Sequence, residues 1–349
     1  MLTLVIVVVI AALVFEYING FHDTANSIAT VVATKTLSPM QAVMLAAATN
    51  LVGALWGTAV AKTITSGIVD THVIEVTSQL VLCALIGGIA WNLITWAAGL
   101  PSSSSHALIG GLCGAALAAA RGNWEAIMWS APADPWFKSG GVLWKVIVPM
   151  VTSPLLGFIV GFLIMGLLYA IISGMTASGG LFRRAAKPRH VNRFFKVAQM
   201  VSAQANGVLD DLPGWLAFLH PSPGALSDGD IDIWIKVTCA LVMAAGTAAG
   251  GWRIIKTLGH KLVKLHPIHG FAAEASAASV ITLASSLGIP VSTTHNISSA
   301  IMGVGTAKRF NAIKWTVVEK MVWAWILTIP MAGGVAYGLF RLIEALGWA

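Results

Sequence analysis

Two short segments of the chain place hydroxyl side chains directly after a Gly-x-Pro sequence. One reads GLPSSSSHALIGGLCG over residues 99–114, and the other reads GIPVSTTHNISSAIMG over residues 288–303. Pro and Gly interrupt a helix, and Ser or Thr favours the start of a new one, whose free N–H groups and positive dipole end attract anions. Two such helix ends facing each other would form an uncharged cradle for a tetrahedral oxyanion. The candidate anion-binding residues are Ser103, Ser104, Ser105, Ser292, Thr293 and Thr294.

These hydroxyl groups have two other interpretations. The first is that they only cap helices or pack between them, which the duplication at matched positions disfavours. The second is a catalytic Ser–His pair, because His106 and His295 end the two clusters. No local acidic residue would orient either imidazole, and a duplicated motif does not fit a single nucleophile. We therefore do not expect an enzyme.

A second group of polar residues, EYINGFHDTANSIAT at 16–30, follows the first apolar run. Asp23 and Asn26 are three residues apart, so one helical turn could aim both side chains at a cation. Carboxylate and amide oxygens suit Na⁺, and the carboxylate could equally carry a proton. A solvated turn at the membrane interface is the alternative. Asn50 and Glu274, each in an apolar run, are weaker candidates.

The composition indicates which elements position these residues. Of 349 residues, 57% are hydrophobic and only 10% are charged, and the mean hydropathy is +0.81. These values exclude an ordinary soluble enzyme, a disordered chain and a disulfide scaffold. We expect an all-α polytopic membrane protein with about 10–12 membrane helices, some of them broken or re-entrant. Apolar runs lie at about 1–18, 40–61, 79–98, 107–120, 141–171, 233–250, 271–288 and 315–340.

No metal site or resident cofactor is expected. The three cysteines lie in apolar stretches, and their spacing fits neither a metal site nor a disulfide framework. Three histidines in or beside a basic segment have no carboxylate or cysteine nearby, so a solvated cytoplasmic loop is expected there. These histidines are His260, His266 and His269.

The charges predict an orientation in the membrane. The 21 basic residues exceed the 14 acidic ones, and many of them cluster at 183–196, 253–264 and 308–314. The stretch 220–232 instead carries three aspartates and no Lys or Arg. The positive-inside rule places the basic loops in the cytoplasm and, by tracing the spans back, both termini outside. Nucleic-acid binding is therefore not needed to explain the positive charge. Contact with anionic lipid or regulatory partners is the alternative for the basic stretches.

The chain reads as two related halves. Besides the paired hydroxyl clusters, NGFHD at 19–23 is echoed by NGVLD at 206–210, which matches Asp23 with Asp210. We expect a first transmembrane repeat at 1–182, a basic cytoplasmic linker at 183–196 and a second repeat at 197–349. Inverted repeats of this kind place a transport site at their interface, near the membrane midplane.

Several long motifs resemble those of one known family. GFHDTANSIATVVATKTLSP, GLPSSSSHALIG and GIPVSTTHNISSAIMGVGTAKR are similar to the signatures of the inorganic phosphate transporter (Pit) family, and GGWRIIKTLGHKLVKLHPIHGFAAE resembles its second half. The resemblance covers nearly the whole chain. It implies an inverted-repeat carrier that moves phosphate with a coupling cation. Phosphate would lie between the two hydroxyl clusters, and Asp23 and Asn26 would belong to the cation site.

One segment departs from the family pattern. Where the second half of the family carries H-G-x-N-D-A-Q-K, this chain reads ANGVLDDLPGW at 205–215. Aligned on Gly207 and Asp210, only the Gly and the Asp survive. Altered coupling, a shifted alignment that uses Asn206 and Asp211, or an impaired protein would each explain the change.

The expected function is symport of inorganic phosphate with H⁺ or Na⁺ across the plasma (inner) membrane. The predicted cation site comprises Asp23, Asn26, Asn50 and Asp210. The alternatives are a carrier for another tetrahedral oxyanion such as sulfate, and a receptor or channel that does not couple transport. Phosphate travelling as a complex with a divalent metal is a further option. Membrane lipid and, in a homodimer, a second copy of the chain are the other expected partners.

Overall fold

The computed structural model describes residues 2–56, 68–134, 139–177, 233–286, 289 and 291–347. Within these ranges the chain is helical, with two isolated β-bridges and no strand. The all-α class predicted from the sequence is confirmed. The helices are α1 (Leu2–Ala33), α2 (Pro39–Trp56), α4 (Ser78–Ala98), α5 (Ser104–Ala119), η1 (Trp124–Ala126), η3 (Leu143–Ile147), α6 (Val148–Ala177), α9 (Ile233–Ala249), α10 (Trp252–Lys256), η6 (Thr257–Lys261), α11 (Pro267–Ser286), α12 (Thr293–Lys308), η7 (Phe310–Ala312) and α13 (Trp315–Ala345).

Four of the described helices are long and apolar enough to cross a membrane. They are α1, α4, the continuous η3–α6 segment and α13, and α9 with α10 adds a fifth span if the bent pair is counted as one. Large apolar side chains along α1, α6 and α13 are exposed, as expected for surfaces that lipid covers. The protein is therefore a multi-pass membrane protein. Among the remaining described helices, α5 is apolar but has only 16 residues, which is shorter than a simple span and is expected where a chain breaks or turns back within the bilayer.

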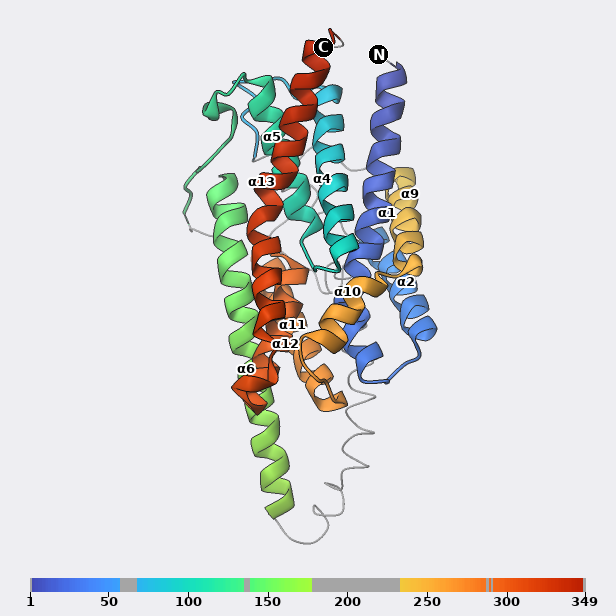
Figure 1. The fold of residues 1–349 in the computed structure, drawn as a ribbon, viewed down its shortest axis with the longest axis vertical. Coiled ribbons are helices and arrows are strands. Elements are labelled where there is room, and N and C mark those ends of the chain that lie inside the picture. Colours follow the sequence, from blue (N-terminus) through green and yellow to red (C-terminus); the bar gives the residue numbers. More distant parts are fainter. Residues whose placement is uncertain are drawn as a thin grey trace.

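Two of the shorter helices belong to hairpins that meet within the bundle. The first hairpin is α4–α5 and the second hairpin is α11–α12, and they occupy opposite halves of the molecule (Figure 1). With 16 residues each, α5 and α12 extend only about 24 Å at 1.5 Å per residue. Their N-terminal ends are in contact, because the rings of His106 and His295 have centroids 5.1 Å apart. The predicted breaks therefore bring both hydroxyl clusters to one place.

Each hairpin packs against a long helix from the other half of the chain. Helix α5 lies against α13, and α12 lies against α6. Gly114 of α5 meets Gly333 of α13, and its repeat counterpart Gly303 of α12 meets Phe158 of α6. A Cβ atom at either glycine would overlap the facing carbonyl oxygen. Small residues at these crossings let the backbones approach closely, as in other membrane helix pairs.

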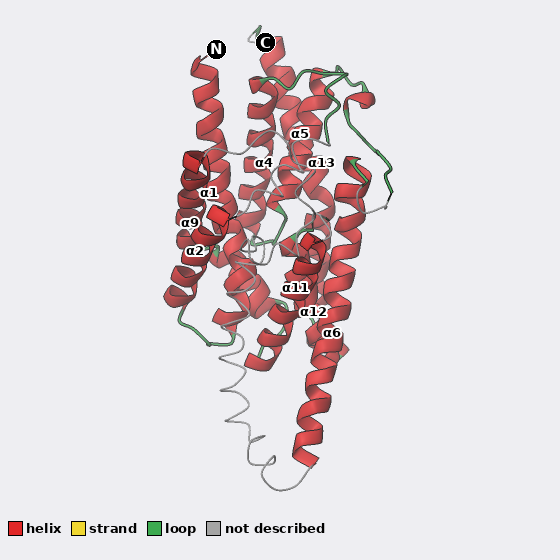
Figure 2. Cartoon of the chain, turned by 180° about the vertical axis from the view of Figure 1, so that it is seen from behind, coloured by secondary structure: helices red, strands yellow, loops and turns green. Residues whose placement is uncertain are grey.

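Helix α1 contacts both hairpins and also packs on α2, α9 and α10. Figure 2 shows α1, α2 and α9 grouped on the side of the molecule away from α6. A Cβ atom at Gly20 of α1 or at Gly246 of α9 would overlap backbone of the other helix, so this crossing also depends on glycine. The helix α1 is thus held in place along the length that carries the polar stretch 16–30.

The predicted basic loop at 253–264 is mostly helical. After Gly250, which has a φ of +70°, the chain bends by 51° and continues as α10 and η6. These helices carry Arg253, Lys256 and Lys261. The expectation of a solvated loop is also wrong for His269, which is buried on α11 with its Nε2 atom 3.0 Å from the Tyr169 hydroxyl. A tertiary partner on α6 satisfies this imidazole, and the sequence carries no signal for that contact.

Both termini lie at the same end of the molecule (Figure 1). Lys314 immediately precedes α13, which runs 31 residues toward the C-terminus, so this basic residue lies at the opposite end. The placement of basic loops and termini on opposite sides of the membrane stays a prediction. The linker at 183–196 and the acidic stretch at 220–232 lie outside the described residues.

Candidate functional site

Both hydroxyl clusters begin a helix with the same local geometry. Ser103 and Ser292 are the N-cap residues of α5 and α12, with backbone φ, ψ angles of −93°, 117° and −80°, 116°. Each Ser Oγ accepts a hydrogen bond at 3.3 Å from the backbone N–H three residues later, on His106 or His295. The prediction that a new helix starts at the Ser and Thr residues is confirmed in both copies, and Ser103 and Ser292 cap these helices.

The remaining hydroxyl groups differ in their surroundings. Ser104 is buried, and its Oγ has no hydrogen-bond partner among the described residues. Ser105 is exposed. In the second copy Thr293 is half-buried and Thr294 is buried. The clusters are therefore matched in backbone but not in side-chain contacts.

Helix α1 brings Asp23 and Asn26 to the second cluster. Asn26 Nδ2 donates to Thr294 Oγ1 at 2.9 Å, with longer contacts to Thr293 Oγ1 at 3.4 Å and Asp23 Oδ1 at 3.2 Å. Thr294 Oγ1 in turn donates to Asp23 Oδ1 at 3.4 Å. The Oδ1 atom of Asn26 is buried without a hydrogen-bond partner in the described part of the chain, so an acceptor oxygen remains free there. These residues, predicted separately as anion and cation ligands, form one connected network.

The stretch 16–30 is part of a helix and not an interfacial turn. Helix α1 continues through it to Ala33, well beyond the apolar run that ends near residue 18. Its polar side chains are accommodated by tertiary contacts, including the Thr24 hydroxyl on the Thr247 carbonyl of α9 at 3.2 Å. Backbone groups within a membrane need hydrogen bonds, and a continuous helix supplies them.

A second network, which the sequence did not indicate, joins α1 to the first hairpin. His22 Nε2 lies 3.2 Å from Thr95 Oγ1 and 3.4 Å from Ser102 Oγ, and the two hydroxyl oxygens are 2.8 Å apart. All three residues are buried. Ser102 directly precedes the first cluster, so this network holds the start of that cluster to α1.

The loop between α4 and α5 is held by side chains from two other directions. Trp325 of α13 donates its indole N–H to the Pro101 carbonyl at 2.9 Å, and Thr257 donates to the Gly99 carbonyl at 2.7 Å. Arg253 donates to the Ala97 carbonyl at 2.7 Å, with its guanidinium carbon 5.0 Å from the centre of the Trp96 ring. These contacts orient the first hydroxyl cluster through its backbone.

The weaker candidates occupy other positions. Asn50 of α2 donates to Thr247 Oγ1 at 2.9 Å, in a contact between α2 and α9. Glu274 of α11 is fully buried and accepts from Thr30 Oγ1 at 2.5 Å, one helical turn beyond Asn26 on α1. Asp210 and the altered segment 205–215 lie outside the described residues.

Comparison with known proteins identifies the family. The profile described as the phosphate transporter family matches residues 19–336. The chain belongs to this family. It is 40% identical to the probable low-affinity inorganic phosphate transporter of Bacillus subtilis (strain 168), covering 98% of this chain and 99% of that protein. A similarly named protein of Rhizobium meliloti (strain 1021) is 41% identical, covering 94% of this chain and 93% of the relative.

A solved structure shares the fold. The structure described as the sodium-dependent phosphate transporter superposes with a TM-score of 0.75 at 22% identity, over 98% of this chain and 99% of that one. As a member of the phosphate transporter family, the protein is a transporter and not an enzyme.

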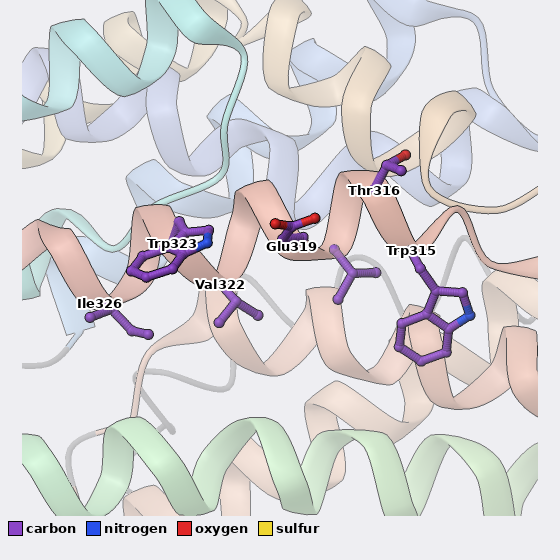
Figure 3. Close-up of a pocket in the computed structure, with 7 residues that line it drawn as sticks. Trp315, Thr316, Glu319, Val322, Trp323 and Ile326 are labelled. Carbon is purple, nitrogen blue, oxygen red and sulfur yellow. The ribbon is translucent and has the colours of Figure 1, made fainter.

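A groove lined by α13 lies apart from this transporter's candidate site. Its lining comes from α13 alone, and neither hydroxyl cluster contributes to it (Figure 3). Two exposed tryptophans, Trp315 and Trp323, are among the lining residues. Exposed tryptophan near the end of a membrane helix is typical of a lipid-facing surface. We therefore assign the groove to the membrane boundary and not to the substrate.

Proposed function

We propose that the protein is a symporter that carries inorganic phosphate across the plasma (inner) membrane together with a cation. Family membership supports phosphate as the transported anion, as do the names of the relatives in Bacillus subtilis and Rhizobium meliloti. The anion would lie between the two hydroxyl clusters, where the N-termini of α5 and α12 meet. Helix dipoles, free N–H groups and hydroxyls would bind it without a formal positive charge.

The coupling proposal rests on the hydrogen bond from Asn26 to Thr294. A cation bound by Asp23 and Asn26 would withdraw both side chains from their present contacts and free the hydroxyls of the second cluster for the anion. Each ligand would thereby raise the affinity for the other, as thermodynamic linkage requires. Asp23 Oδ1 and the unpartnered Asn26 Oδ1 are hard oxygen donors. We propose Na⁺ as the coupling ion, in line with the name of the structural neighbour.

We further propose that the two halves are inverted repeats with their termini outside. The matched N-caps, the meeting of the two hairpins from opposite halves of the molecule and the exchanged packing of α5 on α13 and α12 on α6 support this duplication. The side of the membrane follows from the basic residues, which we expect to face the cytoplasm.

The deciding experiment is radiolabelled phosphate uptake by purified protein in liposomes under an imposed Na⁺ gradient, with an H⁺ gradient and no gradient in parallel. We expect saturable uptake that the Na⁺ gradient drives. Uptake driven only by the H⁺ gradient would show that the coupling ion is H⁺ and not Na⁺. Uptake that does not saturate and does not depend on either gradient would indicate a channel. Competition by sulfate but not by unlabelled phosphate would contradict the proposal that phosphate is the substrate. Omission of divalent metal tests for a metal–phosphate complex.

A further inference from the structure

Two buried imidazoles face each other where the two hairpins meet. His106 and His295 follow the two hydroxyl clusters at matched positions, and their relative exposures are 5% and 0%. Their ring centroids are 5.1 Å apart with an interplanar angle of 69°, an edge-to-face arrangement. The pair therefore lies at the junction of the first and second hairpins, beside the N-termini of α5 and α12.

Three of the four nitrogens of these rings have no hydrogen-bond partner among the described residues. Nδ1 of His106 and both ring nitrogens of His295 are buried and make no hydrogen bond within the described ranges. The Oγ of Ser104, two residues before His106, is in the same condition. A buried polar group without a hydrogen-bond partner destabilises the folded state, so such groups are rare unless a ligand or water completes them. Their gathering at two facing helix N-termini indicates that a polar ligand completes them.

The face of the His295 ring packs against a tryptophan of α13. It stacks on Trp325 with centroids 4.4 Å apart and an interplanar angle of 29°. The same tryptophan donates its N–H to the Pro101 carbonyl of the first hairpin. Stacking uses the face of the imidazole and leaves the nitrogen-bearing edge free to bond. The orientation of the ring is therefore set before any ligand binds.

We propose that His106 and His295 hydrogen-bond directly to the transported anion and make the site selective for phosphate over sulfate. This inference rests on the proposed function. A neutral imidazole has one N–H donor and one acceptor nitrogen. Near neutral pH, phosphate carries at least one P–OH group that can donate to the acceptor nitrogen, whereas sulfate carries no proton. Sulfate would therefore leave a buried acceptor unpaired, which is an effective way to reject an analogue.

The alternative is that the rings serve only as packing between the hairpins, and two substitutions separate these roles. His295→Phe keeps an aromatic ring for Trp325 and removes both nitrogens, whereas His295→Gln loses the ring and keeps a donor and an acceptor. The same pair at His106 provides an independent test if one site fails to fold. His269→Gln is the matched control, because His269 is also buried but bonds to Tyr169.

The readouts are the phosphate KM at saturating Na⁺ in liposomes, inhibition of uptake by sulfate, and the phosphate-induced rise in Tm of purified protein. For the Phe variants we expect KM to rise about tenfold or more, with stronger sulfate inhibition, and for the Gln variants a KM within about threefold of the parent. His269→Gln should match the parent in both phosphate KM and sulfate inhibition. The proposal would be overturned if the Phe variants kept the parental phosphate KM and the parental sulfate inhibition. It would also be overturned if the Gln variants raised the KM as much as the Phe variants do. Loss of uptake in the parent protein would instead contradict the proposed function, and the Tm shift would still test the imidazoles.

Discussion

The two hydroxyl clusters share a backbone and differ in their neighbours. Ser103 and Ser292 cap their helices with the same hydrogen bond at the same distance. The second cluster contacts Asp23 and Asn26 of α1 through its side chains. The first cluster instead is held by bonds to the loop before it, and its Ser104 hydroxyl has no partner among the described residues.

This difference suggests how a duplicated motif acquires two roles. Both copies present a helix N-terminus to the same space, so both suit an anion. Among the described residues, a hydroxyl of the second copy bonds to Asp23 and none of the first copy does, so the second copy joins the anion site to the proposed cation site. We expect substitutions in the second cluster to affect both ligands and substitutions in the first cluster to affect phosphate alone.

The largest effect is expected at Asp23, on which the difference depends. Asp23→Asn removes the negative charge of the proposed cation site, and we expect Na⁺-driven phosphate uptake to fall by about 100-fold or more, equivalent to ~2.7 kcal/mol. The protein should remain in the membrane at parental levels. The control is Asp70→Asn, because the backbone N–H of Asp70 bonds to the Ala126 carbonyl beyond the C-terminal end of α5; it should transport normally. Normal coupled uptake by Asp23→Asn would remove this carboxylate from the cation site.

The second-largest effect is expected at the close helix crossings that both hairpins share. Gly114→Ala and Gly303→Ala each place a methyl group on a facing backbone carbonyl, and we expect each to lower stability by about 1–3 kcal/mol. Thermal unfolding of the purified variants measures this loss. Gly166→Ala, where a Cβ meets open space, should not destabilise the protein. If only one of the paired glycines proved sensitive, the hairpins would not pack equivalently.

A direct comparison of the clusters pairs Thr294→Val with Ser104→Ala. Each removes one hydroxyl, so we expect the phosphate KM to rise about tenfold in both, the equivalent of one buried hydrogen bond. Of these two variants, Thr294→Val alone should also change the Na⁺ concentration for half-maximal uptake, because the Thr294 hydroxyl bonds to Asp23 and Asn26 whereas the Ser104 hydroxyl has no partner among the described residues. Equal Na⁺ dependence in the two variants would abolish the proposed division of roles.

The smallest effect is expected at the support of the first cluster. Arg253→Gln loses the cation–π contact with Trp96 and weakens the bond to the Ala97 carbonyl. Because both act through the α4–α5 loop, we expect the phosphate KM to rise about threefold, in line with an exposed contact of about 0.5–1 kcal/mol. Lys256→Gln removes an exposed charge from the same helix and should leave the KM unchanged. An equal rise in the phosphate KM of both variants would mean that the loss of positive charge, and not the loss of these contacts, is responsible.

Local features of the site were predictable from the sequence. Pro101 and the hydroxyls after it carry short-range signals, so the break and the start of a new helix at the Ser and Thr residues could be placed in both copies. The spacing of Asp23 and Asn26 likewise placed both on one turn of helix. The long apolar runs located the membrane helices for the same reason, since hydropathy is a local property.

Contacts between distant segments were not predictable from one sequence. Nothing local to Asn26 indicates that it meets Thr294 rather than its counterpart Ser105, because that choice depends on how α1 packs. The network of His22 with Thr95 and Ser102 was missed for the same reason. Helix α1 looked shorter because its polar residues resemble a turn, and their partners on other helices were not visible.

His22 and Asn26 lie one helical turn apart on α1 and bond to different hairpins. This arrangement matters for whether ions could pass through the protein without phosphate. A carrier leaks when its inner and outer paths open together, so that ions pass without their cargo. If both hairpin tips left α1 at once, the bonds from His22 and from Asn26 would break together, each worth about 0.5–1.5 kcal/mol. Releasing one tip keeps the bonds to the other. In the proposed transport cycle, we therefore expect this turn of α1 to disfavour a state in which both tips are released.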